Sequence, residues 1–186
     1  MGIFGFEGKL DQEAAKKSPD LFLMSIPECE CNCYLCNRAC EEAPCWGLPS
    51  EIERLMDEGY GNKLSDYVVE PGYYHLPNTR VRTHWPNPDV HIIAPAATGY
   101  GGLRRGSTPT FITFRGRCVF LRGRGRKTVC ELHPTGLKPI EGRVASHDTS
   151  FDDGILIREA IIDVWDTDYG RSVVSRWLYD FSKYRI

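Results

Sequence analysis

The chain has 186 residues, of which 41% are hydrophobic and 26% charged, and its formal net charge is -2. This length suits one domain with a sizeable core, and the composition excludes wholesale disorder. A net charge this small argues against a protein that binds nucleic acid with its whole surface. No stretch approaches the roughly 18 unbroken apolar residues of a membrane span, and residues 1–17 lack the pattern of a signal peptide. We therefore expect a cytoplasmic protein.

The N-terminal part predicts short helices followed by a cysteine-rich loop. Residues 11–17 have the composition of a short polar helix, and Ser18-Pro19 supplies the N-cap and first position of a further turn. The segment 27–46 holds six cysteines and shows no apolar periodicity. This indicates a loop, or turns and short helices, organised by metal ligation, and we expect the ligation energy to contribute to folding.

The middle of the chain predicts one helix and several short extended segments. The helix begins near Ser50, which has Glu53 three residues later, the spacing of a capping box. Residues 62–110 contain six prolines and indicate extended segments and loops, with a short strand at 90–93. Residues 111–121 favour a strand or hairpin, followed by glycines that are typical of turns.

The last third predicts two core helices. Apolar residues recur along 155–165 and 171–181 with the spacing of a buried helix and an amphipathic helix. Asp152 or Asp153 is placed to cap the first helix, and Gly170 either separates the two helices or lies in a kink.

These elements together predict an α+β fold in one domain that spans residues 1–186. Ligand segments at 29–45 and 118–133 would form a small metal-organised part with few short strands and irregular loops. This part would pack on the helical C-terminal segment 152–183.

Eight cysteines dominate the chemistry of the sequence. In a reducing cytoplasm, clustered thiols bind metals more readily than they form disulfides. Six of them follow the spacing C-x-C-x-C-x2-C-x3-C-x4-C between residues 29 and 45, and the first three are too close in sequence for easy mutual bridging. Cys118 and Cys130 lie far downstream. We expect these cysteines to converge on one metal centre.

A tetrahedral thiolate site needs four ligands at about 2.3 Å from zinc, and two short clips in the sequence commonly supply them. Cys33 and Cys36 form one such clip, and Cys130 with His133 is a candidate for the second. Because the ligands number more than four, the sequence also allows two zinc ions or an iron–sulfur cluster. The expected cofactor is therefore zinc or an iron–sulfur cluster.

The candidate metal ligands are Cys33, Cys36, Cys40, Cys45, Cys118, Cys130, His133, Cys29 and Cys31. Cys29 and Cys31 lie at the edge of the cluster, and His133 is either a ligand or a residue that hydrogen-bonds to one. The other histidines are interpreted otherwise. His75, His84 and His91 lack a partner at ligand spacing and are taken as ordinary loop histidines. His147 beside Asp148 indicates either an acid–base pair or, more simply, a helix-capping Asp beside a surface His.

Four parts of the sequence share a pattern: the group Cys33, Cys36, Cys40 and Cys45, then Cys118-Val-Phe-Leu, then Cys130-Glu-Leu-His133, then the Lys138-Pro139 turn. This pattern resembles the YkgJ-like cysteine-cluster family of zinc- or iron-chelating domains. The resemblance covers residues 29–45 and 118–147, and it implies bound metal without implying a particular reaction.

The chain departs from this family at one position. Family members usually carry another cysteine after the Lys-Pro turn, where this chain has only Glu141, Arg143 and His147. The last ligand would then be a histidine, or one of the additional cysteines Cys29 and Cys31.

A basic stretch lies at residues 104–127, which hold eight basic residues and no acidic one. Local positive charge attracts phosphates, and interleaved phenylalanines can stack on bases. The simpler interpretation is a strand pair whose arginines face water and whose phenylalanines face the core. The candidate phosphate- or nucleic-acid-binding residues are Arg104, Arg105, Arg122, Arg124, Arg126 and Lys127.

Two classes of function fit these features. The first is a metal-binding protein, partnered by a metal ion and by another protein, whose centre is structural, serves interaction or handles metal. It is favoured because no known catalytic motif is present. The second is a metal-dependent or iron–sulfur redox enzyme. It would act on a phosphate-containing or nucleic-acid substrate held by the basic stretch, with Glu131 as the acid–base group.

Overall fold

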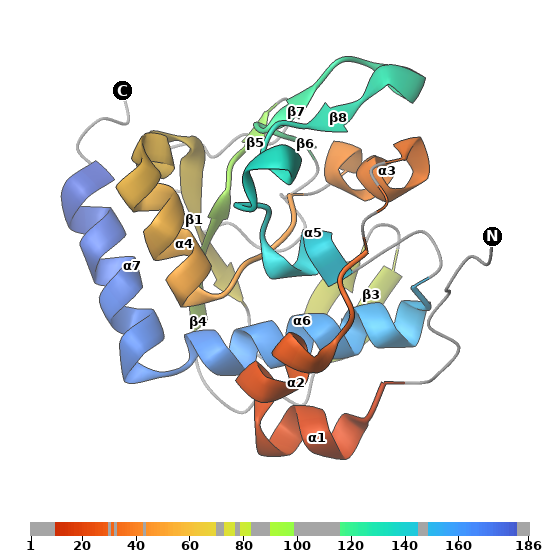
Figure 1. Ribbon diagram of the computed structural model, residues 1–186. Helices are drawn as coiled ribbons and strands as arrows, with labels where there is room; N and C mark the ends of the chain where they lie inside the picture. The colour runs from red at the N-terminus through yellow and green to blue at the C-terminus, as the bar shows by residue number, and fades with distance from the viewer. Residues whose placement is uncertain are drawn as a thin grey trace.

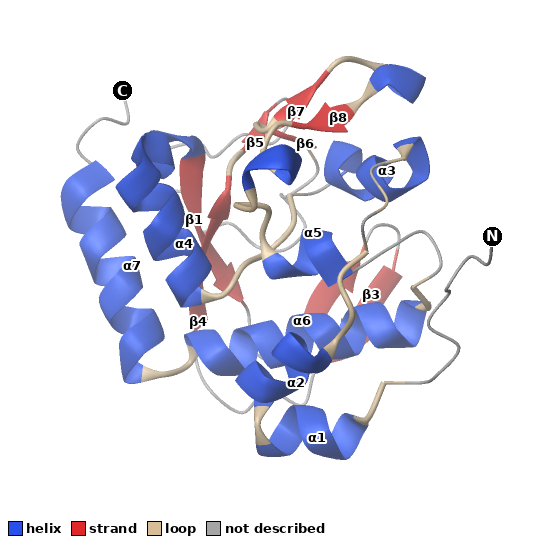
Figure 2. Ribbon diagram, viewed as in Figure 1, coloured by secondary structure: helices blue, strands red, loops and turns tan. Residues whose placement is uncertain are grey.

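The fold is α+β, as the sequence predicts, with helices packed around small antiparallel strand pairs (Figure 1, Figure 2). The computed structural model describes residues 10–29, 31, 33–42, 44–69, 73–76, 79–82, 90–98, 116–144 and 149–181. The helices are α1 (Gln12–Lys17), α2 (Pro19–Ser25), α3 (Tyr34–Glu42), α4 (Pro49–Leu55), α5 (Ile140–Val144), α6 (Phe151–Trp165) and α7 (Asp168–Phe181). Shorter helical turns are η1 (Met56–Tyr60), η2 (Gly61–Lys63), η4 (Gly125–Lys127) and η5 (His133–Thr135).

The strands form antiparallel pairs, two strands to each sheet. The pairs are β1 (Leu64–Val69) with β4 (Val90–Pro95), β2 (Tyr73–Leu76) with β3 (Thr79–Arg82), β5 (Ala97–Thr98) with β6 (Arg117–Cys118), and β7 (Leu121–Arg122) with β8 (Val129–Cys130). The strand predicted at 90–93 is confirmed as β4. Residues 111–115 of the predicted strand or hairpin lie outside the described residues.

The C-terminal helices carry the centre of the core. Ile157, Ile161 and Trp165 of α6 are almost completely buried, as is Trp177 of α7. The two tryptophans also form long-range hydrogen bonds: Trp165 Nε1 donates to the carbonyl of Gly47 at 2.8 Å, and Trp177 Nε1 to that of Gly61 at 2.9 Å. Because burying an indole N–H without an acceptor is costly, these bonds fix α6 and α7 against the segment around α4.

The N-terminal helices are confirmed close to their predicted bounds. The carboxylate of Asp11 caps α1 by accepting from the backbone N–H of Glu13 and Ala14, and α2 begins at Pro19 as predicted. Phe22 and Leu23 of α2 are buried where α2 packs against α6. This pair of helices therefore covers one side of α6 (Figure 1).

Two predicted helix caps are wrong by a few residues. Helix α4 begins at Pro49, and the side chain of Glu51 returns to the N–H of Leu48 at 2.9 Å, so Ser50 lies inside the helix. Proline favours the first helical position because its φ is already helical. Helix α6 is capped by Ser150 rather than by an aspartate. Asp153 instead accepts a hydrogen bond from the N–H of Leu10 at 3.1 Å.

No helix in the described part of the chain is long and apolar enough to cross a membrane.

Gly170 is required by the close approach of α7 to the end of α6. A Cβ at this position would lie 2.2 Å from the carbonyl oxygen of Trp165. We predict that Gly170→Ala lowers the free energy of unfolding by about 2 kcal/mol, since the backbone must move to relieve the overlap. Chemical denaturation measures this change.

The matched control is Gly154→Ala in α6, where a Cβ would meet nothing within 4 Å. This substitution should raise the free energy of unfolding by roughly 0.5–1 kcal/mol, the usual gain of alanine over glycine inside a helix. Similar effects of the two substitutions would contradict the close approach.

Candidate metal centre

All eight cysteines lie in the described part of the chain, and all are free thiols. The structure arranges them in two groups. The loop group is Cys29, Cys31, Cys33 and Cys36, which are partly exposed, and the core group is Cys40, Cys45, Cys118 and Cys130, which are buried. The groups meet at α3, because Cys36 and Cys40 lie one turn apart on this helix.

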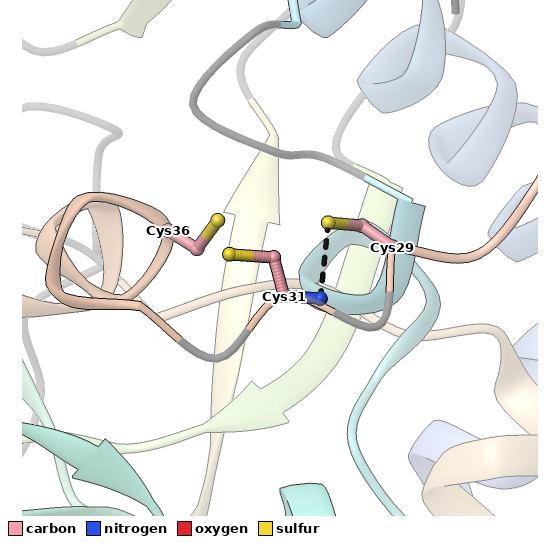
Figure 3. A group of neighbouring side chains, drawn as sticks. All are labelled: Cys29, Cys31 and Cys36. Atoms are coloured by element: carbon pink, nitrogen blue, oxygen red, sulfur yellow. Dashed lines mark hydrogen bonds between the residues drawn. The ribbon is translucent and has the colours of Figure 1, made fainter. Parts of the chain in front are cut away.

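Three thiols of the loop group lie close enough to share a metal ion. The sulfur atoms of Cys29, Cys31 and Cys36 are all within 4.8 Å of one another. Figure 3 shows the three side chains directed into a common space, Cys29 and Cys31 from the loop and Cys36 from the first turn of α3. Sulfur atoms in this arrangement could therefore hold a metal ion.

Cys33 extends this group to four thiols. Its sulfur lies 3.7 Å from that of Cys36. Cys33 directly precedes α3, and hydrogen bonds from the backbone N–H of Cys36, from the thiol of Cys31 and from the N–H of Leu35 lower its pKa to about 6. The thiolate is thus favoured at neutral pH, because it occupies the N-terminal end of a helix, where N–H groups point outward.

The loop group is held to the rest of the protein by Arg143 in α5. The backbone N–H of Cys29 donates to the carbonyl of Arg143 at 2.7 Å. The Arg143 guanidinium forms ion pairs with Glu28 beside the loop and with Glu51 in α4. Arginine suits this position because its planar guanidinium group carries five N–H donors, which can bind more than one carboxylate at once.

The core group comes from four separate parts of the chain. Cys40 lies on α3, Cys45 in the segment before α4, and Cys118 and Cys130 end β6 and β8, which both pack against α3. A hydrogen bond joins the thiols of Cys40 and Cys45, which lowers the pKa of Cys40 and raises that of Cys45. Burial raises the pKa of Cys118 and of Cys130.

His133 lies beside the core group, in η5, and is partly exposed. Its pKa is lowered by burial and by the charge of Lys138. A neutral imidazole is the form that binds metal. That His133 binds the metal, or hydrogen-bonds to a residue that does, stays a prediction.

The remaining histidines are placed as follows. The prediction that His91 is a loop residue is wrong. His91 lies in β4, and its Nδ1 is 3.0 Å from the carboxylate of Asp66. His84 and His147 lie outside the described residues, as does the side chain of His75.

The described part of the basic stretch divides into paired and exposed residues. Arg122 contacts the carboxylate of Glu131 at 2.5 Å, and Lys63 contacts the same carboxylate at 3.0 Å. Arg124, Arg126 and Lys127 are exposed around η4, at the tip of the β7–β8 hairpin. Arg104 and Arg105 lie outside the described residues. Phosphate binding by this stretch stays a prediction.

The comparisons with known proteins add no relative: no family model, no curated protein and no solved structure matches the chain. The resemblance to the YkgJ-like family stays a prediction from the cysteine spacing.

Lys138 is a residue near the thiols whose role the sequence does not reveal. It is 4% exposed, and its charge acts on Cys40, Cys130 and His133. Lysine is rarely buried so deeply without an anionic partner. The sequence pattern includes the Lys138-Pro139 turn, but it does not indicate that the Lys138 side chain is buried.

The low pKa of Cys33 predicts selective reactivity in the metal-free protein. Alkylation by iodoacetamide at Cys33 should rise with pH around a midpoint near 6, because the thiolate is the nucleophile. Buried Cys118 should stay unreactive over the same range, because burial raises its pKa. Mass spectrometry of tryptic peptides measures the extent of alkylation at Cys33 and at Cys118 for each pH. A midpoint for Cys33 near that of free cysteine, about 8.5, would contradict the helix-end geometry.

Proposed function

We propose that this chain is a metal-binding protein whose loop group holds one zinc ion, with Cys29, Cys31, Cys33 and Cys36 as the ligands. The observation that carries the proposal is the spacing of Cys29, Cys31 and Cys36, whose sulfur atoms lie within 4.8 Å of one another. The YkgJ-like pattern of cysteines supports the same function.

The compactness of the loop group favours a single ion. With zinc–sulfur bonds of about 2.3 Å, two sulfur atoms of a tetrahedral site are about 3.8 Å apart. The distance of 3.7 Å between Cys33 and Cys36 matches that edge. An iron–sulfur cluster places its inorganic core between the thiolates, and so needs a wider set of ligands.

The electrostatics of the loop also favour metal binding at neutral pH. A metal must displace the protons of its thiol ligands, and this costs least where a thiolate already forms. Cys33 meets that condition, because hydrogen bonds from the N–H of Cys36, from the thiols of Cys31 and Cys36 and from the N–H of Leu35 lower its pKa to about 6. Thiols in this state are kept from oxidation in a reducing compartment, which supports the cytoplasm as the place of action.

The position of the loop group favours metal handling or interaction over stabilisation of the core. Its ligands are partly exposed and come from one short segment. The core is held independently, by Trp165 and Trp177 with their carbonyl partners. An ion in the loop is therefore accessible to a partner protein and can be exchanged while the core stays folded.

The alternative function, a metal-dependent enzyme, has less support from the geometry. Its candidate acid–base group, Glu131, is shared between Lys63 and Arg122. These ion pairs tie the β7–β8 hairpin to η2, which is a structural task. Both carboxylate oxygens of Glu131 are thus engaged, Oε1 by Lys63 and Oε2 by Arg122.

The metal content of loop variants tests the proposal. We predict that Cys29→Ser with Cys36→Ser lowers bound zinc by one ion per chain, measured by elemental analysis after expression in zinc-supplemented medium. Leu35→Ala is the matched control, because Leu35 lies between the ligands on the first turn of α3 and its side chain is 53% exposed. It should keep the full zinc content. Equal zinc in the double variant and the wild type would overturn the proposal.

Metal should also change the thermal stability in a way that depends on the ligands. A ligand at a hundred times its Kd stabilises the folded state by about 2.7 kcal/mol. We predict that Cys33→Ser with Cys36→Ser lowers the Tm in the presence of zinc, measured by calorimetry. After treatment with a chelator that strips the loop ion, wild type and variant should melt together, because these side chains contribute little to the core. A difference of equal size without metal would indicate a packing role instead.

A further inference from the structure

We propose that Cys33 and Cys36 are a redox modification site, which a hydroperoxide oxidises to a disulfide and a reductant returns to two thiols. The disulfide forms in the metal-free loop and does not require Cys29 or Cys31. Where the loop holds zinc, the disulfide releases the ion, and this second statement rests on the function proposed above.

The sulfur atoms of Cys33 and Cys36 lie close enough to bond after a small movement. They are 3.7 Å apart, and the sulfur atoms of a disulfide are about 2.05 Å apart. The pair must therefore close by about 1.7 Å. A change in the side-chain torsions of the two cysteines supplies a movement of this size, so that the helix need not unwind.

The backbone around the pair has the separation that a disulfide needs. The N–H of Asn37 donates to the carbonyl of Cys33 at 3.1 Å, which is the helical bond that closes the first turn of α3. Residues three apart in such a turn have Cα atoms about 5 Å apart. Disulfides usually join Cα atoms that are about 4.4–6.8 Å apart. Cys33 and Cys36 are three residues apart and meet this condition.

Helix α3 is held from its other side, which gives its first turn a fixed position. Asn37, which directly follows Cys36, is completely buried, and its Nδ2 donates to the carbonyl of Thr128 at 3.2 Å. The hydroxyl of Thr128 donates to the carboxylate of Glu41 at 2.8 Å, and Arg117 lies 3.7 Å from the same carboxylate. These contacts tie α3 to β6 and to the β7–β8 hairpin. Closing the pair therefore moves side chains and not the helix.

Exposure makes the loop group the part of the chain that an oxidant reaches. Cys33 and Cys36 are partly exposed, whereas all members of the core group are buried. Because oxidation of cysteine follows exposure, a small hydroperoxide should oxidise the loop and leave the core thiols unchanged. Within the loop, Cys29 and Cys31 are separated by one residue, which is too close in sequence for easy mutual bridging.

The reaction proceeds in two steps. In the first, one sulfur, as thiolate, attacks the outer oxygen of the hydroperoxide ROOH; an S–O bond forms, the O–O bond breaks, and the alkoxide takes up the thiol proton to leave as ROH. In the second, the other thiolate attacks the sulfenic sulfur; the S–S bond forms, the S–O bond breaks, and hydroxide takes up the second proton to leave as water. The two sulfur atoms together lose two electrons, and the two peroxide oxygens gain them.

The disulfide and the metal compete for the same two sulfur atoms. Since the thiolate is the form that binds metal, oxidation removes two of the four proposed ligands. Cys29 and Cys31 alone would leave a tetrahedral site half filled. The ion is then lost, while the hydrogen bonds of Trp165 and Trp177 to their carbonyl partners keep the core folded.

Thiol counting in the metal-free protein tests the disulfide. The full-length protein is stripped with a chelator, treated with one equivalent of hydrogen peroxide, denatured, and titrated with a chromogenic thiol reagent. We expect the count to fall by two from the eight thiols of the reduced chain. A phosphine reductant should restore all eight. Fragmentation of the unreduced tryptic peptide by mass spectrometry should place the new bond between Cys33 and Cys36, and a bond between any other two cysteines would overturn the assignment.

Matched double variants identify the partners independently. Cys29→Ser with Cys31→Ser leaves the pair in place and should lose two thiols to peroxide, as the wild type does. Cys33→Ser with Cys36→Ser removes the pair and should form no disulfide. The reverse pattern, with the bond lost in the first variant and kept in the second, would overturn the site.

Zinc release tests the link to the proposed function. Zinc-loaded wild type treated with hydrogen peroxide should release one ion per chain to a chromophoric indicator, in step with the loss of two thiols, and rebind it after reduction. A disulfide that forms without release would overturn the link. If the chain binds no zinc but the metal-free protein forms the disulfide, the redox site stands and the proposed function falls. If the chain binds zinc but the metal-free protein keeps all its thiols, the redox site falls and the proposed function stands.

Discussion

The buried ion pair between Glu141 and Arg158 is the interaction on which both thiol groups depend. It joins α5 to α6 at 2.5 Å, with side chains only 13% and 11% exposed. The same carboxylate accepts from the N–H of Trp46 at 2.7 Å, and the guanidinium lies 4.8 Å from the centre of the Trp46 ring. One charge pair thus fixes the residue that follows Cys45 and the helix that carries Arg143. Removal of one partner from such a pair commonly costs about 3–5 kcal/mol, because the other charge is left buried.

Much of the helical framework was predictable, because apolar periodicity is a local property of the sequence. The segments at 155–165 and 171–181 face the core on one side, and this spacing is visible without a structure. The caps were less predictable, since several residues near a helix end can accept the same N–H groups. At α6, the side chain of Ser150 accepts the hydrogen bond from the backbone N–H of Asp153 and so caps the helix. The carboxylate of Asp153 accepts a hydrogen bond from the N–H of Leu10 instead.

The identity of the candidate ligands followed from cysteine chemistry, but their division into groups did not. Spacing along the chain does not tell which side of α3 each thiol faces or how deeply it is buried. Cys29 and Cys31 lie at the edge of the cluster in sequence and yet belong to its most compact part in space. The Lys138-Pro139 turn was visible as part of the sequence pattern, but the burial of Lys138 could not be predicted, because it depends on residues that are distant in sequence.

Helix α3 carries Cys36 on one turn and Cys40 on the next, and it has nine residues. A helix of this length spans roughly 13 Å and moves as a rigid body. An ion that draws in one end of this helix therefore changes the position of the thiol at the other. Because the thiol of Cys40 is hydrogen-bonded to that of Cys45, such a shift would also reach the segment before α4.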